Sequence, residues 1–240
     1  GCVGIVENEA YIFVEKGVED EIGVKKIRSF FPRIKRDNLK LLGPAGFDAD
    51  GDPAVYIVIS ISIFPKSTEY IVSRVYSYNL DATFPGNSGA EVIFIRAGAS
   101  RKKDDLKTFL SHEFNHLLVL SYDLYDDIWI CEGMGYLSAH LIGHEPAYLK
   151  TIHLDAFLNW QKNALVSEEM NIYNHISVYQ FFKFLYKKYG LEAIRKIARD
   201  PCDGQDSVAK SVGKPWDEIW LEYEEACRQE GIPLDDPNRH

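Results

Sequence analysis

Two histidines and a glutamate near the middle of this 240-residue chain have the spacing of a metal-dependent hydrolase. In His112-Glu113-Phe114-Asn115-His116 the histidines are four positions apart, so on a helix both imidazoles project from one face and can bind one cation. Glu113 projects beside them, where its carboxylate can accept a proton from a water molecule activated by the metal. The pattern therefore predicts His112 and His116 as zinc ligands and Glu113 as a general base.

The residues around the motif favour the helix that this arrangement requires. Asp104 and Asp105 provide carboxylates for the N-cap and the first turn, where negative charge is favourable. Apolar residues then recur at helical spacing, which predicts that one face of the helix is buried against a core. These residues are Leu106, Phe109, Leu110, Phe114, Leu117 and Leu118.

A third ligand must come from outside the motif, because a catalytic zinc site has three protein ligands and one open position. Metzincins extend the motif with a glycine and a third histidine. Val119 and Tyr122 stand at those two positions here, which excludes that class. The remaining alternative, the gluzincin arrangement, takes a glutamate from a following helix.

Glu132 is the best candidate for that glutamate. It stands in Trp129-Ile130-Cys131-Glu132-Gly133 and opens a predicted helix, Glu132 to Ile142. The segment from Leu117 to Cys131, between the second histidine and this glutamate, is predicted to be a loop. A loop of this length can turn the chain back toward the metal.

The sequence resembles the hyicolysin family of bacterial zinc metallopeptidases at this point. The specific part is His112 to Gly133, with a Trp-x-x-Glu-Gly element after the first motif and Cys131 where asparagine is expected. Weaker similarity extends over residues 20–227, in the segments 47–59, 87–95, 108–114, 173–190 and 213–216. The resemblance implies a zincin-like fold and a gluzincin endopeptidase that hydrolyses peptide bonds in proteins.

The resemblance also suggests the residue that stabilises the transition state. Tyr173, at the start of a tyrosine-led helix, matches the tyrosine of the family and is the first choice as oxyanion donor. His175 and His153 are the alternatives, and Tyr173 can also be a packing aromatic. Two other functions stay open: a peptidase-like surface protein that binds host or matrix proteins without turnover, and a hydrolase of non-peptide substrates.

Hydrophobic periodicity predicts an α+β fold that divides near Tyr122. Residues 1–122 are expected to form a β-rich lobe that contains the motif helix, and residues 123–240 a helical lobe with the third ligand, together one catalytic domain. The predicted strands are 10–15, 55–64, 70–78 and 91–96. Turns rich in Gly, Pro, Asp and Asn separate them. Predicted helices, besides the motif helix, are 20–35, 133–142, 147–165, 176–189, 191–199, 207–212 and 216–229.

Two segments of the β-rich lobe are candidates for binding. Glu91 to Arg96 is expected to be an edge strand that binds a peptide substrate through main-chain hydrogen bonds, the alternative being an internal strand. Asp48, Asp50 and Asp52 have the spacing of a calcium loop, but Ile59 stands where an EF-hand needs a bidentate glutamate. An acidic turn is therefore preferred at that place.

Composition agrees with a compact enzyme and excludes several partners. A net charge of -9 disfavours nucleic acid, and no apolar run approaches the length needed to span a bilayer. Gly1-Cys2 allows a lipid anchor at Cys2, the alternative being that Cys2 is an ordinary residue, and a secreted or cell-envelope location is expected. Cys2, Cys131, Cys202 and Cys227 lack metal-knuckle spacing, and Cys131 is expected to pack beside the site.

Overall fold

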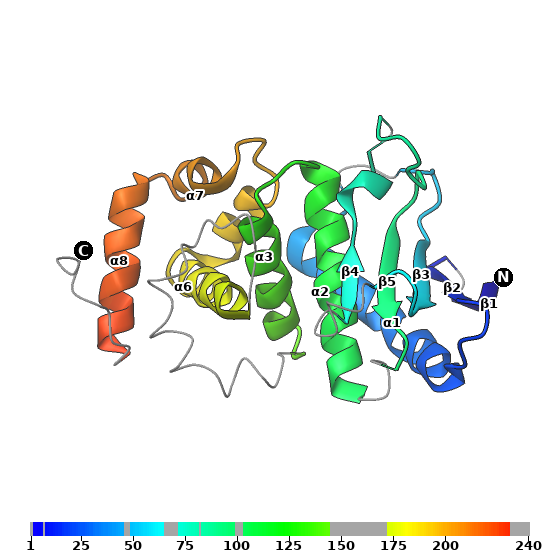
Figure 1. Cartoon of the computed structure of the whole chain (residues 1–240). Helices are drawn as coiled ribbons and strands as arrows, with labels where there is room; N and C mark the ends of the chain where they lie inside the picture. The colour runs from blue at the N-terminus through cyan, green and yellow to red at the C-terminus, as the bar shows by residue number, and fades with distance from the viewer. Residues whose placement is uncertain are drawn as a thin grey trace. The chain divides into compact units, whose positions relative to one another are not determined.

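The computed structural model of the chain describes residues 2–6, 8–45, 49–64, 72–81, 83–98, 103–144 and 172–230 (Figure 1). Their main elements are a five-stranded mixed sheet and six α-helices, so the fold is α+β, as the sequence predicts. The chain divides into two compact units. The first contains the residues up to Leu124 and a segment that begins at Ser138, and the second contains Tyr125–Leu137 and the C-terminal helices.

The sheet belongs to the first unit and has the strand order β1-β2-β3-β5-β4. The three central strands are parallel, and each outer strand is antiparallel to its neighbour. The strands are β1 (Cys2–Val6), β2 (Ala10–Val14), β3 (Val55–Ser60), β4 (Ser73–Val75) and β5 (Val92–Arg96). The central strands are rich in β-branched residues, which pack well on a pleated surface. Fully buried side chains on them are Ile12, Ile57, Ile59, Ile93 and Ile95.

Helix α1 (Glu21–Leu42) packs against the motif helix of the same unit. It begins after Asp20, whose carboxylate accepts a hydrogen bond from the N–H of Gly23 at 3.1 Å and so caps the helix. It ends at Gly43, which has a φ of 96°, a backbone conformation that favours glycine. The predicted helix at 20–35 is therefore confirmed at its start and extends further than expected.

The motif helix, α2 (Lys103–Tyr122), contacts α1, β4 and β5. Phe114 of α2 packs edge to face against Phe31 of α1, with ring centroids 5.7 Å apart. The predicted apolar stripe is buried at Leu106, Leu110 and Phe114. Since α2 already begins at Lys103, Asp104 lies inside the helix and is not its N-cap.

The second unit is built on aromatic packing between helices. It contains α6 (Ile172–Ile197), α7 (Gly204–Val212), α8 (Trp216–Gln229) and the first ten residues of α3 (Ile128–Leu141). A glycine with a φ of 79°, Gly190, interrupts α6 at the predicted stop. Ring centroids 5.1–6.2 Å apart connect Trp129, Phe181, Phe182, Trp216, Trp220 and Tyr223.

The connection between α2 and α3 is shorter than predicted. Helix α2 continues to Tyr122 because its apolar residues beyond the motif remain buried, and α3 begins at Ile128. Backbone N–H groups of Ile130 and Cys131 donate to the carbonyl of Asp127, which closes the first turn of α3. Only residues 123–127 lie between the two helices, so the prediction of a loop from Leu117 to Cys131 is wrong at both ends.

The strands also differ from prediction at their ends. β3 stops at Ser60 and not at Phe64, because the carboxylate of Glu15 accepts hydrogen bonds from the N–H groups of Ile61 and Ser62 and turns the chain. β4 has three residues and is followed by a 3₁₀ turn at Ser77–Asn79. Strand β1 has no counterpart among the predicted strands.

The expected edge strand is internal. β5, which corresponds to the predicted strand 91–96, lies between β3 and β4 and forms ladders with both. In the described part of the sheet the outer strand on that side is β4. The sequence could not distinguish an internal strand from an edge strand here. Val92, Ile93, Phe94 and Ile95 are all apolar, so no alternation of apolar and polar residues marks an exposed face.

The acidic segment at 48–52 forms hydrogen bonds within the protein where it is described. Asp52 accepts hydrogen bonds from the N–H of Ala54 at 2.9 Å and from the hydroxyl of Tyr11 at 2.8 Å. The carboxylate of Asp50 accepts a hydrogen bond from the N–H of Asp52 at 2.9 Å. The hydrogen bonds from Ala54 and Tyr11 lower the pKa of Asp52 below its ordinary value. Asp48 lies outside the described residues.

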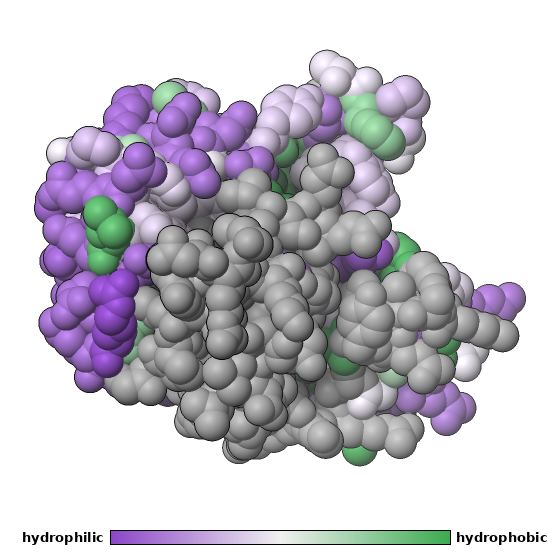
Figure 2. Space-filling view, turned by 60° about the vertical axis from the view of Figure 1, so that its left-hand side comes forward, coloured by the Kyte–Doolittle hydropathy of each residue, from purple (hydrophilic) through white to green (hydrophobic). Residues whose placement is uncertain are grey.

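Several remaining predictions concern the surface and the cysteines. The described residues visible in Figure 2 are mostly hydrophilic, and large exposed apolar side chains such as Ile5, Phe84 and Leu221 are scattered over several elements. Among the described helices, none has the length and apolar character that crossing a membrane requires. Cys131, Cys202 and Cys227 form no disulfide among the described residues. The side chain of Cys2 and the predicted helix 147–165 lie outside the described residues.

Candidate metal centre

Helix α2 brings His112, Glu113 and His116 together on one face. A possible ligand atom from each of these residues lies within 4.8 Å of the others, so the group could hold a metal ion. The two imidazole rings meet edge to face with centroids 4.4 Å apart. All three side chains are buried, with exposed fractions of 7%, 4% and 7%. The helical spacing on which the sequence argument rests is therefore present as predicted.

The carboxylate of Glu113 is held on one side only. Its Oε1 accepts a hydrogen bond of 2.7 Å from the hydroxyl of Ser73 on β4. Its Oε2 is buried and has no hydrogen-bond partner among the described residues. Leaving a buried carboxylate oxygen unsatisfied is costly, and such groups commonly mark the place of an ion or a water molecule. This observation fits a cation or a bound water beside Glu113.

A buried hydrogen-bonded set of Asn38, Ser111 and Ser138, called the Asn38 clip, fixes the position of α2 next to His112. Asn38 of α1 donates through Nδ2 to the hydroxyl of Ser111 at 3.2 Å and to the carbonyl of Ile34 at 3.0 Å. Its Oδ1 accepts a hydrogen bond from Ser138 of α3. Asn38 and Ser111 are fully buried and Ser138 is 1% exposed. One asparagine thus joins three helices at the residue that precedes His112.

A further buried amide lies between the two histidines in sequence. Asn115 is fully buried, and neither polar atom of its side chain has a hydrogen-bond partner among the described residues. With Oε2 of Glu113, this makes three polar atoms on one turn of α2 that no described protein group satisfies. Helix α2 therefore places buried polar groups within an otherwise apolar core.

Glu132 lies in the second unit and is not a member of the group on α2. It is the fifth residue of α3, inside the helix and not at its opening as predicted. Its Oε2 is 3.3 Å from Nδ1 of His175, and the hydroxyl of Tyr136 is 2.8 Å from the same nitrogen. Glu132, Tyr136 and His175 thus form a half-buried polar cluster within their own unit.

The predicted transition-state donors are described only in part. Tyr173 lies in the first turn of α6, but its side chain is outside the described residues, as is the whole of His153. His175 lies two residues further along α6, and its side chain is 23% exposed. The structure thus places one alternative donor, His175, in contact with the predicted third ligand.

Ser73 and Asn38 are the residues that sequence reasoning missed. Ser73 is an isolated serine in a short strand, and Asn38 stands in a helix whose neighbouring residues are mostly basic or apolar. Neither residue belongs to a motif, and both contact partners that are distant in the sequence. Ser73 is 40 residues from Glu113, and Asn38 is 73 residues from Ser111. The buried polar position of Asn38 in an amphipathic helix was the only available signal.

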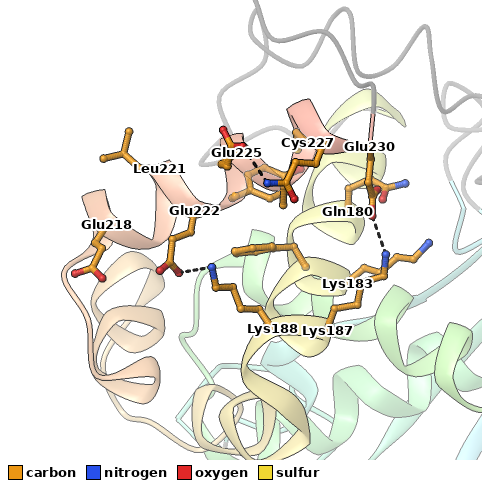
Figure 3. A pocket seen from close by; sticks show the side chains of 14 residues that line it. Gln180, Lys183, Lys187, Lys188, Glu218, Leu221, Glu222, Glu225, Cys227 and Glu230 are labelled. Atoms are coloured by element: carbon orange, nitrogen blue, oxygen red, sulfur yellow. Dashed lines mark hydrogen bonds and ion pairs between the residues drawn. The ribbon is translucent and has the colours of Figure 1, made fainter.

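A cavity of about 540 Å³ lies elsewhere, between α6 and α8 of the second unit (Figure 3). Lysines on α6 and glutamates on α8 line it and pair with one another, as in Lys188–Glu222 at 3.2 Å and Lys187–Glu230 at 2.9 Å. None of the predicted site residues whose side chains the structure describes lines this cavity. Its charged side chains, lysines on one side and glutamates on the other, are typical of a solvent-exposed groove between two helices.

Comparison with other proteins adds no family assignment. No protein-family model matches the chain, and no characterised protein gives a significant match to its sequence.

Proposed function

We propose that the protein is a zinc-dependent endopeptidase with its metal bound by helix α2. The observation that carries the proposal is the buried group of His112, Glu113 and His116, in which one oxygen of Glu113 is held by Ser73 and the other is buried without a partner. Two imidazole ligands suit a transition metal such as zinc better than a hard cation that prefers only oxygen ligands.

Each residue of the motif has a distinct proposed task. His112 and His116 bind the metal through their imidazole nitrogens, and Glu113 is the general base. Zinc held by these two imidazoles would supply Lewis-acid chemistry, which activates water at neutral pH. The unpartnered Oε2 of Glu113 then takes up a proton and transfers it to the leaving amine.

Glu132 is the proposed third ligand, and the support for it is chemical and positional. It stands after the motif as the glutamate of a gluzincin does, on the same helix as Ser138 of the clip. A contact between its carboxylate and a histidine is also typical of metal ligands, whose outer oxygens are usually held by second partners. Tyr173, or alternatively His175, is the proposed oxyanion donor.

A protein or peptide is the proposed substrate because the metal group lies beside an outer strand. Ser73, which contacts Glu113, belongs to β4, and β4 pairs through Ser73, Arg74 and Val75 with β5 on its inner side only in the described part of the sheet. An extended peptide can add to such an edge through main-chain hydrogen bonds. That geometry favours cleavage within a chain.

The proposal is tested by proteolysis of denatured casein with zinc-loaded protein, with and without a chelator. We expect peptide release that the chelator abolishes and added zinc restores, since the site needs its metal to be reactive. Bound zinc without any turnover of casein or of a mixed peptide library would support a peptidase-like binding protein instead. Turnover that the chelator leaves unchanged would contradict metal catalysis.

A further inference from the structure

We propose that Ser73 is a positioning residue for Glu113: its hydroxyl fixes the carboxylate so that one oxygen is kept away from the metal and the other faces the reacting water. This inference deepens the proposed function and rests on it. It is drawn from a direct contact, because Oγ of Ser73 lies 2.7 Å from Oε1 of Glu113 while Oε2 has no partner among the described residues.

The two oxygens of an ionised carboxylate are chemically equal until something distinguishes them. Here the strand makes the distinction, since Ser73 is held in register with Ile95 on the ladder between β4 and β5. Its hydroxyl therefore comes from a rigid element and not from a loop. A hydrogen bond of this length to a charged acceptor is among the stronger ones, and it restricts rotation of the Glu113 side chain.

This restriction has a specific consequence at a metal site. One carboxylate oxygen of Glu113 lies within 4.8 Å of a nitrogen of each imidazole, so rotation of the side chain can bring the carboxylate onto a metal held by the two histidines. A base that ligates the metal can no longer accept a proton from water beside it. By occupying Oε1, Ser73 opposes that rotation and leaves Oε2 for proton transfer, which requires close alignment of the reacting atoms.

The same unit contains a matched control for this bond. Ser60 of β3 donates from its hydroxyl to Oε2 of Glu15 at 2.7 Å, the same length and the same pair of residue types. That bond belongs to the turn after β3, where the backbone N–H groups of Ile61 and Ser62 also bind Glu15. Ser60→Ala therefore removes an equivalent serine–glutamate bond outside the metal group.

The first experiment compares Ser73→Ala, Ser73→Thr and Ser60→Ala as zinc-loaded proteins on one peptide substrate. We expect kcat of Ser73→Ala to fall about 10- to 10²-fold, with KM within about 2-fold, because misplacing a catalytic group slows the chemical step. Ser73→Thr keeps a hydroxyl on a strand and should recover most of kcat. Ser60→Ala should match the unchanged protein, and zinc content should be the same in all of them.

The second experiment does not depend on peptide hydrolysis. The protein is loaded with Co²⁺ in place of zinc, and the visible absorption of the metal reports its ligands. We expect Ser73→Ala to change this spectrum, because the released carboxylate can enter the coordination sphere. In a Glu113→Ala background the Ser73→Ala change should have no effect, since its only route to the metal is then absent.

The outcomes separate this inference from the proposed function. If Co²⁺ binds and its spectrum responds to Ser73→Ala only when Glu113 is present, the positioning role holds even if no peptide is ever cleaved. An unchanged spectrum, an equal effect in both backgrounds, or failure to bind Co²⁺ would overturn it. A kcat of Ser73→Ala within 2-fold of the unchanged protein, or equal losses in Ser73→Ala and Ser60→Ala, would overturn it as well.

Discussion

The two units of the molecule bury different kinds of side chain. In the first unit, polar groups are buried around α2, including the Asn38 clip, the metal group and Asn115. In the second unit, the buried centre is a set of packed rings around Phe181, which contacts Trp216 at 5.5 Å and Tyr223 at 5.1 Å between centroids. Among the described residues, only the first unit contains a buried group that could hold a metal ion.

This difference indicates which of the two units carries the candidate metal site. Buried polar groups cost stability unless they are hydrogen-bonded, so several of them on one helix turn make that turn a candidate for a chemical task. Aromatic packing adds stability without any such task. The second unit also buries polar side chains, at Asn174, Ser177 and Ser207. Its cluster of Glu132, Tyr136 and His175 contains the predicted third ligand.

The largest effect is expected from Glu113→Gln. The amide keeps the shape of the side chain and can still accept the hydrogen bond from Ser73, but it cannot take up a proton. We expect turnover to fall by about 10²- to 10⁴-fold while zinc content is unchanged. Loss of the metal in the purified variant would make Glu113 a ligand, and turnover near that of the unchanged protein would remove it from the reaction.

Tyr173→Phe tests whether helix α6 contributes a group to the chemistry. If the phenol of Tyr173 donates to the oxyanion, turnover should fall about 10²-fold while KM and zinc content stay nearly the same. Phenylalanine preserves packing, so the variant separates a chemical role from a structural one. Unchanged turnover would leave Tyr173 as a packing aromatic, and His175→Ala would be the next variant to measure.

Gly133→Ala examines the packed interior of the second unit. An added Cβ at this position would lie 2.2 Å from the ring of Phe182, which is fully buried and cannot move away easily. We expect a loss of about 3 kcal/mol in the free energy of unfolding, within the range of overpacked cores. Urea unfolding followed by circular dichroism measures it. The double variant Gly133→Ala/Phe182→Leu should recover part of the loss, and no recovery would contradict the clash.

Asn38→Ala examines the polar interior of the first unit. It removes a partner from both Ser111 and Ser138, and the hydroxyls left in a buried place should cost about 1–3 kcal/mol of unfolding free energy. Asn79→Ala is the matched control, because Asn79 is also buried in this unit but lies outside the clip. Equal losses in the two variants would show that the clip adds nothing beyond ordinary burial.

The sequence was enough to predict that His112, Glu113 and His116 lie together, but not which residues surround them. His112, Glu113 and His116 were predictable because their relation is local, fixed by the geometry of one helix. The contacts of Ser73 and Asn38 depend on strand register and helix packing, which no local pattern encodes. For the same reason β4, and not β5, proved to be the outer strand.

Helix boundaries failed where two signals competed. The acidic residues at 123–127 correctly indicated a connection, but Ile128 and Trp129 were assigned to it although they begin α3. Trp129 is 1% exposed, and its packing against Phe181 and Phe182 extends the helix toward its N-terminus. Tertiary packing of an apolar face commonly outweighs local signals in this way.

The most direct test of the account is the zinc content of the dialysed protein and of single ligand variants, measured by atomic absorption. We expect one zinc per chain in the unchanged protein and a large loss in His112→Ala, His116→Ala and Glu132→Ala, because a site with one ligand fewer competes poorly with water. Full zinc in Glu132→Ala alone would move the third ligand elsewhere, with Asp126 and Asp127 the next candidates. Full zinc in both histidine variants would contradict the metal centre on α2.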